Sequence, residues 1–178
     1  EADYKRAIID FEKALQMNPS SSEVYGVRGI AYLGLKDMAR ALSDFNKAIE
    51  NGTDPKDYYF LRGSVYFELT RYEKALNDFN RAIEIKSDYA EAIHGKGMIY
   101  YRRGELDLAL KEFNRAIAFK QDVADFYFSR GEIYCKKRDL EAAQNDFTKA
   151  IKMNPGFSNA YSGRGWVRRK MGNPKGAI

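Results

Sequence analysis

Residues 59–82 read YFLRGSVYFELTRYEKALNDFNRA, and the same order of residue types returns along the whole chain every 34 residues. Gly63 of this stretch belongs to a column of five glycines, Tyr66 to a column of four tyrosines, and Phe79 to a column of five phenylalanines. Two columns of alanine, one of them through Ala75, keep the same spacing. No insertion or deletion interrupts the register across 178 residues, which is the sequence signature of a repeat protein. The glycine column is Gly29, Gly63, Gly97, Gly131 and Gly165.

Within one period, the spacing of apolar residues predicts two α-helices joined by a short turn. In residues 3–16, apolar side chains recur at i, i+1, i+4, i+7 and i+8 from Ala7 onward, so they occupy one face of a helix. Helix-breaking pairs such as Asn18-Pro19 and Asn154-Pro155 separate one pair of helices from the next. A glycine inside a helix costs roughly 1 kcal/mol relative to alanine, so five in register indicate that a neighbouring helix approaches closely.

The sequence therefore predicts an all-α fold, an α-solenoid of antiparallel helix pairs with a 34-residue period. We interpret residues 1–178 as a single array. Residues 1–21 would supply only the second helix of a repeat, and residues 158–178 would form a truncated repeat. The complete repeats would span residues 22–55, 56–89, 90–123 and 124–157. Neither end has the polar cap that a solenoid needs for solubility, so we expect the chain to be a fragment of a longer protein.

These columns resemble those of the tetratricopeptide repeat (TPR) family: an aromatic residue, then glycine, tyrosine, alanine, phenylalanine and alanine. The resemblance covers the whole chain, in an Arg-Gly form with a cation before each glycine where the family more often has leucine. It implies a right-handed superhelix whose first helices line a concave groove. The chain departs from the pattern at Ile93, which replaces the first aromatic residue of one repeat, and at Arg168, which replaces the last tyrosine.

Charged residues change together at two positions of the repeat. The residue before each glycine is a cation and the residue before each following phenylalanine is an acid, and the one repeat with Lys in place of Arg has Glu in place of Asp. We therefore predict structural ion pairs between the two helices of each repeat rather than a row of charges that binds a ligand. The predicted pairs are Arg28–Asp44, Arg62–Asp78, Lys96–Glu112 and Arg130–Asp146.

The resemblance also identifies the positions that face the groove. Five of them carry rings outside the packing columns, and we expect these rings, together with an acidic residue, to form a peptide-binding groove. Packing between successive first helices is the alternative for the same rings. The predicted groove residues are Phe60, Phe67, His94, Tyr101, Phe128 and Glu132. The lysine, asparagine and arginine with which co-chaperone members hold a terminal carboxylate are missing from the corresponding positions.

The composition disfavours an enzyme. The single cysteine, Cys135, excludes an internal disulfide framework and a cysteine-based zinc site within this chain. The single histidine, His94, is expected about two helical turns, or roughly 10 Å, from Cys135 along the array, too far for a nucleophile and its base. We predict no catalytic residues, no metal and no cofactor.

Charge is distributed unevenly along the chain. Residues 1–89 carry 13 Lys/Arg and 15 Asp/Glu, whereas residues 90–178 carry 17 and 10. Basic clusters near the turns of the later repeats would form an edge for nucleic acid or an anionic surface, although cations also stabilise helix C-termini without any partner. These clusters are Arg102-Arg103, Lys136-Lys137-Arg138 and Arg168-Arg169-Lys170.

The function that these observations favour is a non-enzymatic scaffold that binds a protein or peptide segment in its groove. One alternative is self-assembly through uncapped terminal helices, with Trp166 and Val167 exposed at the end of the array. A second alternative is nucleic-acid or anionic-surface binding by the basic edge, but the sequence favours a protein partner over nucleic acid or a membrane. Residues 1–25 lack the features of a signal peptide, but the chain opens at Glu1 without an initiator Met, so a removed leader stays open; the location is unknown, with the cytoplasm favoured.

Overall fold

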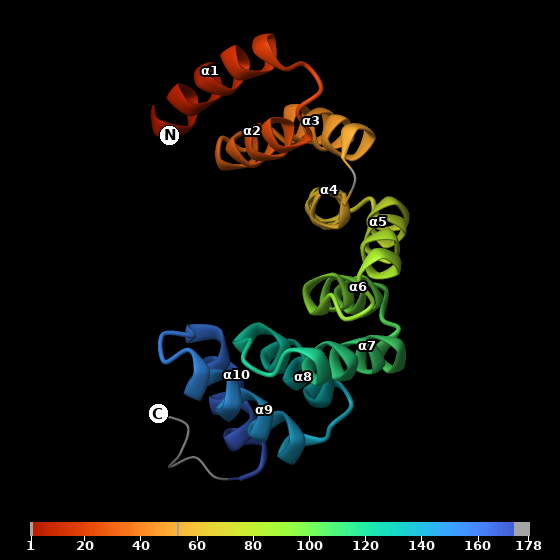
Figure 1. Ribbon diagram of the computed structural model, residues 1–178. Helices are drawn as coiled ribbons and strands as arrows, with labels where there is room; N and C mark the ends of the chain where they lie inside the picture. The colour runs from red at the N-terminus through yellow and green to blue at the C-terminus, as the bar shows by residue number, and fades with distance from the viewer. Residues whose placement is uncertain (1, 53, 173–178) are drawn as a thin grey trace. The chain divides into compact units, whose positions relative to one another are not determined.

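This computed structural model describes residues 2–52 and 54–172, in which α-helices joined by short turns are the only regular secondary structure. They divide between two compact units, Glu1–Ser87 with α1 to α5 and Asp88–Ile178 with α6 to α10 (Figure 1). The helices are α1 (Ala2–Met17), α2 (Ser22–Gly34), α3 (Met38–Asn51), α4 (Lys56–Glu68), α5 (Tyr72–Ile85), α6 (Ala90–Arg103), α7 (Leu106–Phe119), α8 (Ala124–Lys136), α9 (Leu140–Met153) and α10 (Ser158–Lys170). The predicted all-α helical-repeat fold is confirmed.

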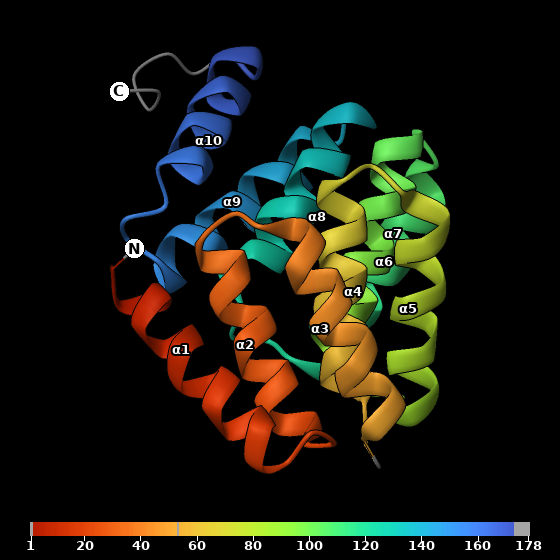
Figure 2. The same ribbon diagram turned by 90° about the horizontal axis from the view of Figure 1, so that it is seen from above.

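Consecutive helices pack as pairs within each unit. In the first unit α2 packs on α3 and α4 on α5; in the second, α6 packs on α7 and α8 on α9, as Figure 2 shows from above. The first helices of these pairs begin at Ser22, Lys56, Ala90 and Ala124, and α10 begins at Ser158. We keep the predicted repeat ranges and the right-handed superhelix as proposals. The last part of the truncated repeat predicted for residues 158–178 lies outside the described residues.

The turn inside each pair follows one backbone pattern. One or two residues after the first helix ends, one residue adopts a left-handed conformation, with φ of 61° at Lys36, 56° at Thr70, 78° at Gly104 and 61° at Arg138. The next residue begins the second helix as its N-cap. At two of these caps an aspartate side chain accepts a hydrogen bond from a backbone N–H, as Asp37 does from Arg40 at 3.0 Å. A short polar side chain at this position therefore satisfies a backbone donor that the helix leaves unpaired.

The column of glycines makes room for the column of phenylalanines. A Cβ atom added at Gly97 would lie 2.6 Å from the Phe113 ring, and one added at Gly131 would lie 2.8 Å from the Phe147 ring. Both rings are fully buried, and the alanine columns beside them are 0% exposed from Ala41 to Ala150. The glycines thus allow the two helices of a pair to approach until ring and backbone touch.

The structure brings the predicted ion pairs together. Three are bidentate, with the arginine Nη2 and Nε atoms donating to both carboxylate oxygens of an aspartate that is nearly inaccessible to solvent. The Nη2–Oδ1 distances are 2.7 Å for Arg28–Asp44, Arg62–Asp78 and Arg130–Asp146, and the Lys96 Nζ–Glu112 Oε1 distance is 3.4 Å. These ion pairs join the first helix of each pair to the second, and each charge is neutralised by its partner within the fold.

Val167 differs from its expected exposure. It is 0% exposed and belongs to a cluster with Ala143 and Phe147 of α9, because α10 packs on α9. Of the two residues predicted to be exposed at the end of the array, only Trp166 has an accessible side chain, at 40% exposure. α10 is thus covered on the side that faces α9.

Candidate peptide-binding groove

The six predicted groove residues lie in different units. Phe60 and Phe67 lie on α4 of the first unit, and the other four lie on α6 and α8 of the second. The ring centroid of Phe60 is 6.0 Å from that of Phe79, and the centroid of Phe67 is 5.7 Å from that of Tyr72. Both α4 rings are half-buried, so part of each is used in packing α4 on α5.

His94 is a packing residue. Its ring stacks between Phe113 of α7, with centroids 5.0 Å apart, and Phe126 of α8, at 4.7 Å. Its Nε2 atom lies 3.0 Å from the buried hydroxyl of Ser129. Burial lowers the pKa of His94 to about 4, so the ring is neutral at physiological pH. The imidazole is held inside the second unit and is not among the residues that line the hollow described next.

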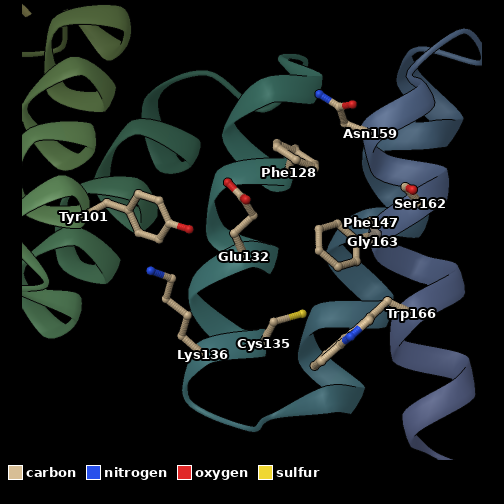
Figure 3. A pocket seen from close by; sticks show the side chains of 10 residues that line it. All are labelled: Tyr101, Phe128, Glu132, Cys135, Lys136, Phe147, Asn159, Ser162, Gly163 and Trp166. Atoms are coloured by element: carbon tan, nitrogen blue, oxygen red, sulfur yellow. The ribbon is translucent and has the colours of Figure 1, made fainter.

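A hollow of about 590 Å³ opens in the second unit between α8 and α10, and we call it the α8–α10 groove (Figure 3). Three predicted groove residues, Tyr101, Phe128 and Glu132, contribute to its wall. Figure 3 shows Tyr101 reaching in from α6, and Trp166 facing the groove from α10. The full lining is Tyr101, Phe128, Glu132, Cys135, Lys136, Phe147, Asn159, Ser162, Gly163 and Trp166.

The apolar wall of the groove is held rigidly. The Phe128 ring lies 5.7 Å from Phe147 and 4.9 Å from Phe157, measured between centroids, so two neighbours fix its orientation. Gly163 leaves space for Phe147, since a Cβ atom there would lie 2.8 Å from the ring. Phe128 therefore presents an accessible ring to a ligand without having to reorganise, and the buried Phe147 ring supports it from behind.

The polar groups of the groove lie near its apolar wall. Partial burial raises the pKa of the Glu132 carboxyl, while Lys136 and Arg102 oppose that shift. The Lys136 ammonium lies over the Tyr101 ring, 4.4 Å from its centroid, which anchors a cation at this side of the groove. Burial also raises the pKa of the Cys135 thiol to about 11, so this cysteine is a neutral side chain at physiological pH.

Some of these residues were not foreseen as groove residues. The sequence placed Lys136 on a basic edge, but its side chain also turns over Tyr101 and lines the groove. Phe147 was assigned to packing, and one part of its ring does reach the hollow. Asn159, an exposed residue on the first turn of α10, has no position in the repeat columns that would have identified it.

Two structural findings bear on other classes of function. Within residues 2–52 and 54–172, no three His, Cys, Asp or Glu side chains are arranged to hold a metal ion. Over those same residues, none of the helices has the length and apolar character needed to cross a membrane.

Comparison with protein families decides the identity of the fold. Models described as "TPR repeat" and "Tetratricopeptide repeat" match residues 2–58, 63–102, 97–138 and 124–157. The chain belongs to the tetratricopeptide repeat family. As a TPR protein it is a scaffold for protein–protein interaction.

Solved TPR structures are similar to this chain over most of its length. MamA is 26% identical, with a TM-score of 0.75 over 86% of this chain and 90% of its own. YrrB, described as "a TPR protein with an unusual peptide-binding site", is 28% identical, with a TM-score of 0.68 over 89% of this chain and 82% of its own. PilF of Pseudomonas aeruginosa, at 13% identity, shares the fold with a TM-score of 0.88 over 99% of this chain and 80% of its own. A comparison with curated proteins gives no match.

Proposed function

We propose that this TPR protein binds a peptide segment of a partner protein in the α8–α10 groove. The observation that carries the proposal is a hollow of about 590 Å³ whose wall combines Phe128, Phe147 and Trp166 with a few polar groups. Ligand sites in proteins commonly have this character, mostly apolar with a small number of polar side chains that orient the ligand. The peptide-binding site of YrrB supports a peptide as the ligand class.

The ligand would place an apolar side chain against Phe128 and Trp166. Aromatic residues bury a large area on binding and are enriched among residues that dominate interface energetics. Glu132 would orient the ligand, since a partly buried carboxylate favours a hydrogen-bond donor nearby. The remaining predicted residues of α4, Phe60 and Phe67, would extend a peptide site in the first unit.

The test begins with short random peptides displayed on phage and selected on the whole chain. Selected peptides, synthesised with a fluorescent label, are then titrated with the wild type and with Phe128→Ala/Trp166→Ala. We expect the double variant to lose about thirtyfold or more in affinity, the effect of removing a residue worth about 2 kcal/mol of binding. Phe119→Ala is the matched control, because this exposed aromatic residue ends α7 outside the groove.

Two outcomes would contradict the proposal. One is a set of selected peptides that the double variant and the wild type bind equally well. The other concerns Ser162→Arg, which fills the groove from an exposed position of α10 and keeps the apolar packing of Phe128 intact. If Ser162→Arg leaves affinity and melting temperature unchanged, the peptides bind elsewhere.

A further inference from the structure

A second hollow adjoins the α8–α10 groove and has a different chemistry. It measures about 370 Å³ and is lined by Cys135, Lys136, Arg138, Leu140, Trp166 and Lys170. We call it the basic pocket. It shares Cys135, Lys136 and Trp166 with the groove, so the two hollows adjoin, and we refer to them together as the path beside α8 and α10.

Three cations line the basic pocket. The Lys136 ammonium lies 4.4 Å from the centroid of the Tyr101 ring, and the Lys170 ammonium lies 5.7 Å from the centroid of the Trp166 ring. Arg138 lies in the turn that connects α8 to α9, where its backbone is left-handed. Within residues 2–52 and 54–172, none of the three cations forms a salt bridge with a carboxylate.

The neighbouring lysine shows the contrast. Lys137, the residue after Lys136, donates to Asp107 at 2.6 Å and is neutralised within the fold. Contact with an aromatic face holds a cation in place but leaves its charge available to an anion. The basic pocket thus keeps a concentrated positive charge beside an apolar groove.

The groove end of the path carries the opposite sign. Glu132 is the one acidic residue among the described residues that line either hollow. It would repel a ligand carboxylate from the Phe128 end while the cations attract one at the Trp166 end. A ligand with an apolar side chain and acidic residues on one side of it fits this path in a single direction.

We propose that the occupant is an acidic peptide segment, with an apolar side chain seated against Phe128 and Trp166 and neighbouring Asp or Glu side chains bound by Lys136, Arg138 and Lys170. This inference rests on the proposed peptide-binding function and specifies its ligand class. The recognition is by side-chain carboxylates that follow an apolar anchor, so it does not require a free chain terminus. Repulsion by Glu132 fixes the direction in which the segment lies.

The test uses the peptides selected on the whole chain and two charge-reversed proteins. Lys136→Glu/Lys170→Glu reverses the basic pocket, and Lys111→Glu/Lys152→Glu makes the same change of net charge at exposed positions of α7 and α9. We expect selected peptides rich in Asp and Glu beside an apolar residue. The first variant should lose about tenfold in affinity for them and the second should lose little, because rim ion pairs act locally.

Further measurements separate the failure of this inference from failure of the proposed function. One outcome is that binding is lost in Phe128→Ala/Trp166→Ala but stays unchanged when the acidic residues of the peptide are replaced by glutamine. This result would overturn the inference about acidic ligands and would agree with the proposed peptide groove. Binding of an oligothymidylate that is as strong as that of the acidic peptides, and insensitive to Phe128→Ala/Trp166→Ala, would also overturn it, because the cations would then bind polyanions without the groove. Peptides whose affinity is unchanged in both Phe128→Ala/Trp166→Ala and Lys136→Glu/Lys170→Glu would overturn both proposals.

Discussion

Arginine side chains in this chain are held by a contact that repeats with the sequence. Arg28 lies 5.5 Å from the ring centroid of Tyr25 and 5.9 Å from that of Tyr32, while its Nε and Nη2 atoms donate to the two carboxylate oxygens of Asp44. Arg62 and Arg130 have the same arrangement of two tyrosine rings and an aspartate. The planar guanidinium suits this position because it can stack on rings and bind a carboxylate with two parallel hydrogen bonds.

One repeat departs from this arrangement at three of its four positions and keeps only the second tyrosine, Tyr100. Lys96 replaces the arginine, Glu112 replaces the aspartate, and Ile93 replaces the first tyrosine. An ammonium group cannot bind both carboxylate oxygens in the way a guanidinium does, and the Glu112 Oε2 atom is buried without a hydrogen-bond partner. These coupled changes show why the sequence pattern could predict the pairs: each side chain is constrained by the partner it faces.

The first prediction concerns Arg62–Asp78, one of the two buried pairs in the first unit. Asp78→Asn should lower the free energy of unfolding by about 3 kcal/mol, since it leaves the Arg62 charge without its counter-ion in a site where Asp78 is 1% exposed. Glu84→Gln is the matched control, because the Arg81–Glu84 pair has the same 2.7 Å distance but Glu84 is 60% exposed. Chemical denaturation of both variants measures the difference, and equal losses would contradict the account.

The second prediction uses His94, the partly buried histidine. His94 titrates at about 4 in the folded chain and near 6.5 when unfolded, so the unfolded state binds more protons between these values and stability falls as the pH drops through that window. Between pH 7 and pH 4.5 we expect this residue to remove about 2 kcal/mol of stability. His94→Phe, which places at this position the residue found at Phe60 and Phe128, should abolish that part of the pH dependence.

Unfolding of wild type and His94→Phe in urea over this pH range compares the two proteins. The free energy of unfolding of His94→Phe minus that of wild type should rise as the pH falls, because only the wild type loses stability through this histidine. A difference that stays constant with pH would show that the imidazole is accessible to protons in the folded state.

At the scale of the element, the turn inside each helix pair is set by one left-handed residue. Glycine occupies this position at Gly104, but Lys36, Thr70 and Arg138 occupy it in the other pairs with positive φ. A β-branched residue is the least suited to this conformation because its side chain clashes with the backbone. Among these turn residues, Thr70 therefore lowers the free energy of unfolding most by adopting a positive φ.

The third prediction follows from this comparison. Thr70→Gly should raise the free energy of unfolding by about 0.5–1 kcal/mol, whereas Gly104→Ala should lower it by about 1 kcal/mol. No atom lies within 4 Å of a Cβ added at Gly104, so the loss there would come from backbone strain alone. Thermal unfolding of the two variants gives the signs, and a destabilised Thr70→Gly protein would contradict this explanation of the turn.

The elements themselves could be predicted from sequence because the columns fix which residues face inward. The side chains that the sequence misplaced are those whose direction depends on rotamer and neighbour. His94 was expected in the groove, but it turns between Phe113 and Phe126; Lys136 was expected on an edge, but it lies over Tyr101. Spacing gives the face of a helix, whereas stacking partners from other helices decide where a long or flat side chain points.

At the scale of the whole molecule, the two units differ in net charge. The residues from Asp88 onward contain 17 Lys/Arg and 11 Asp/Glu, while Glu1–Ser87 contains 13 and 14. The second unit also contains the α8–α10 groove and the basic pocket. Its net positive charge would attract an acidic partner at long range, and this attraction should weaken as the ionic strength rises.

The most direct test of the peptide-binding account uses the single tryptophan of the chain, Trp166, which lines both hollows. A selected peptide without tryptophan is titrated into the protein while the indole emission is recorded. The account predicts a saturable shift of the Trp166 emission with the same midpoint as binding of the labelled peptide, and a much weaker response in Phe128→Ala. Saturated peptide binding that leaves the Trp166 emission unchanged would contradict the account.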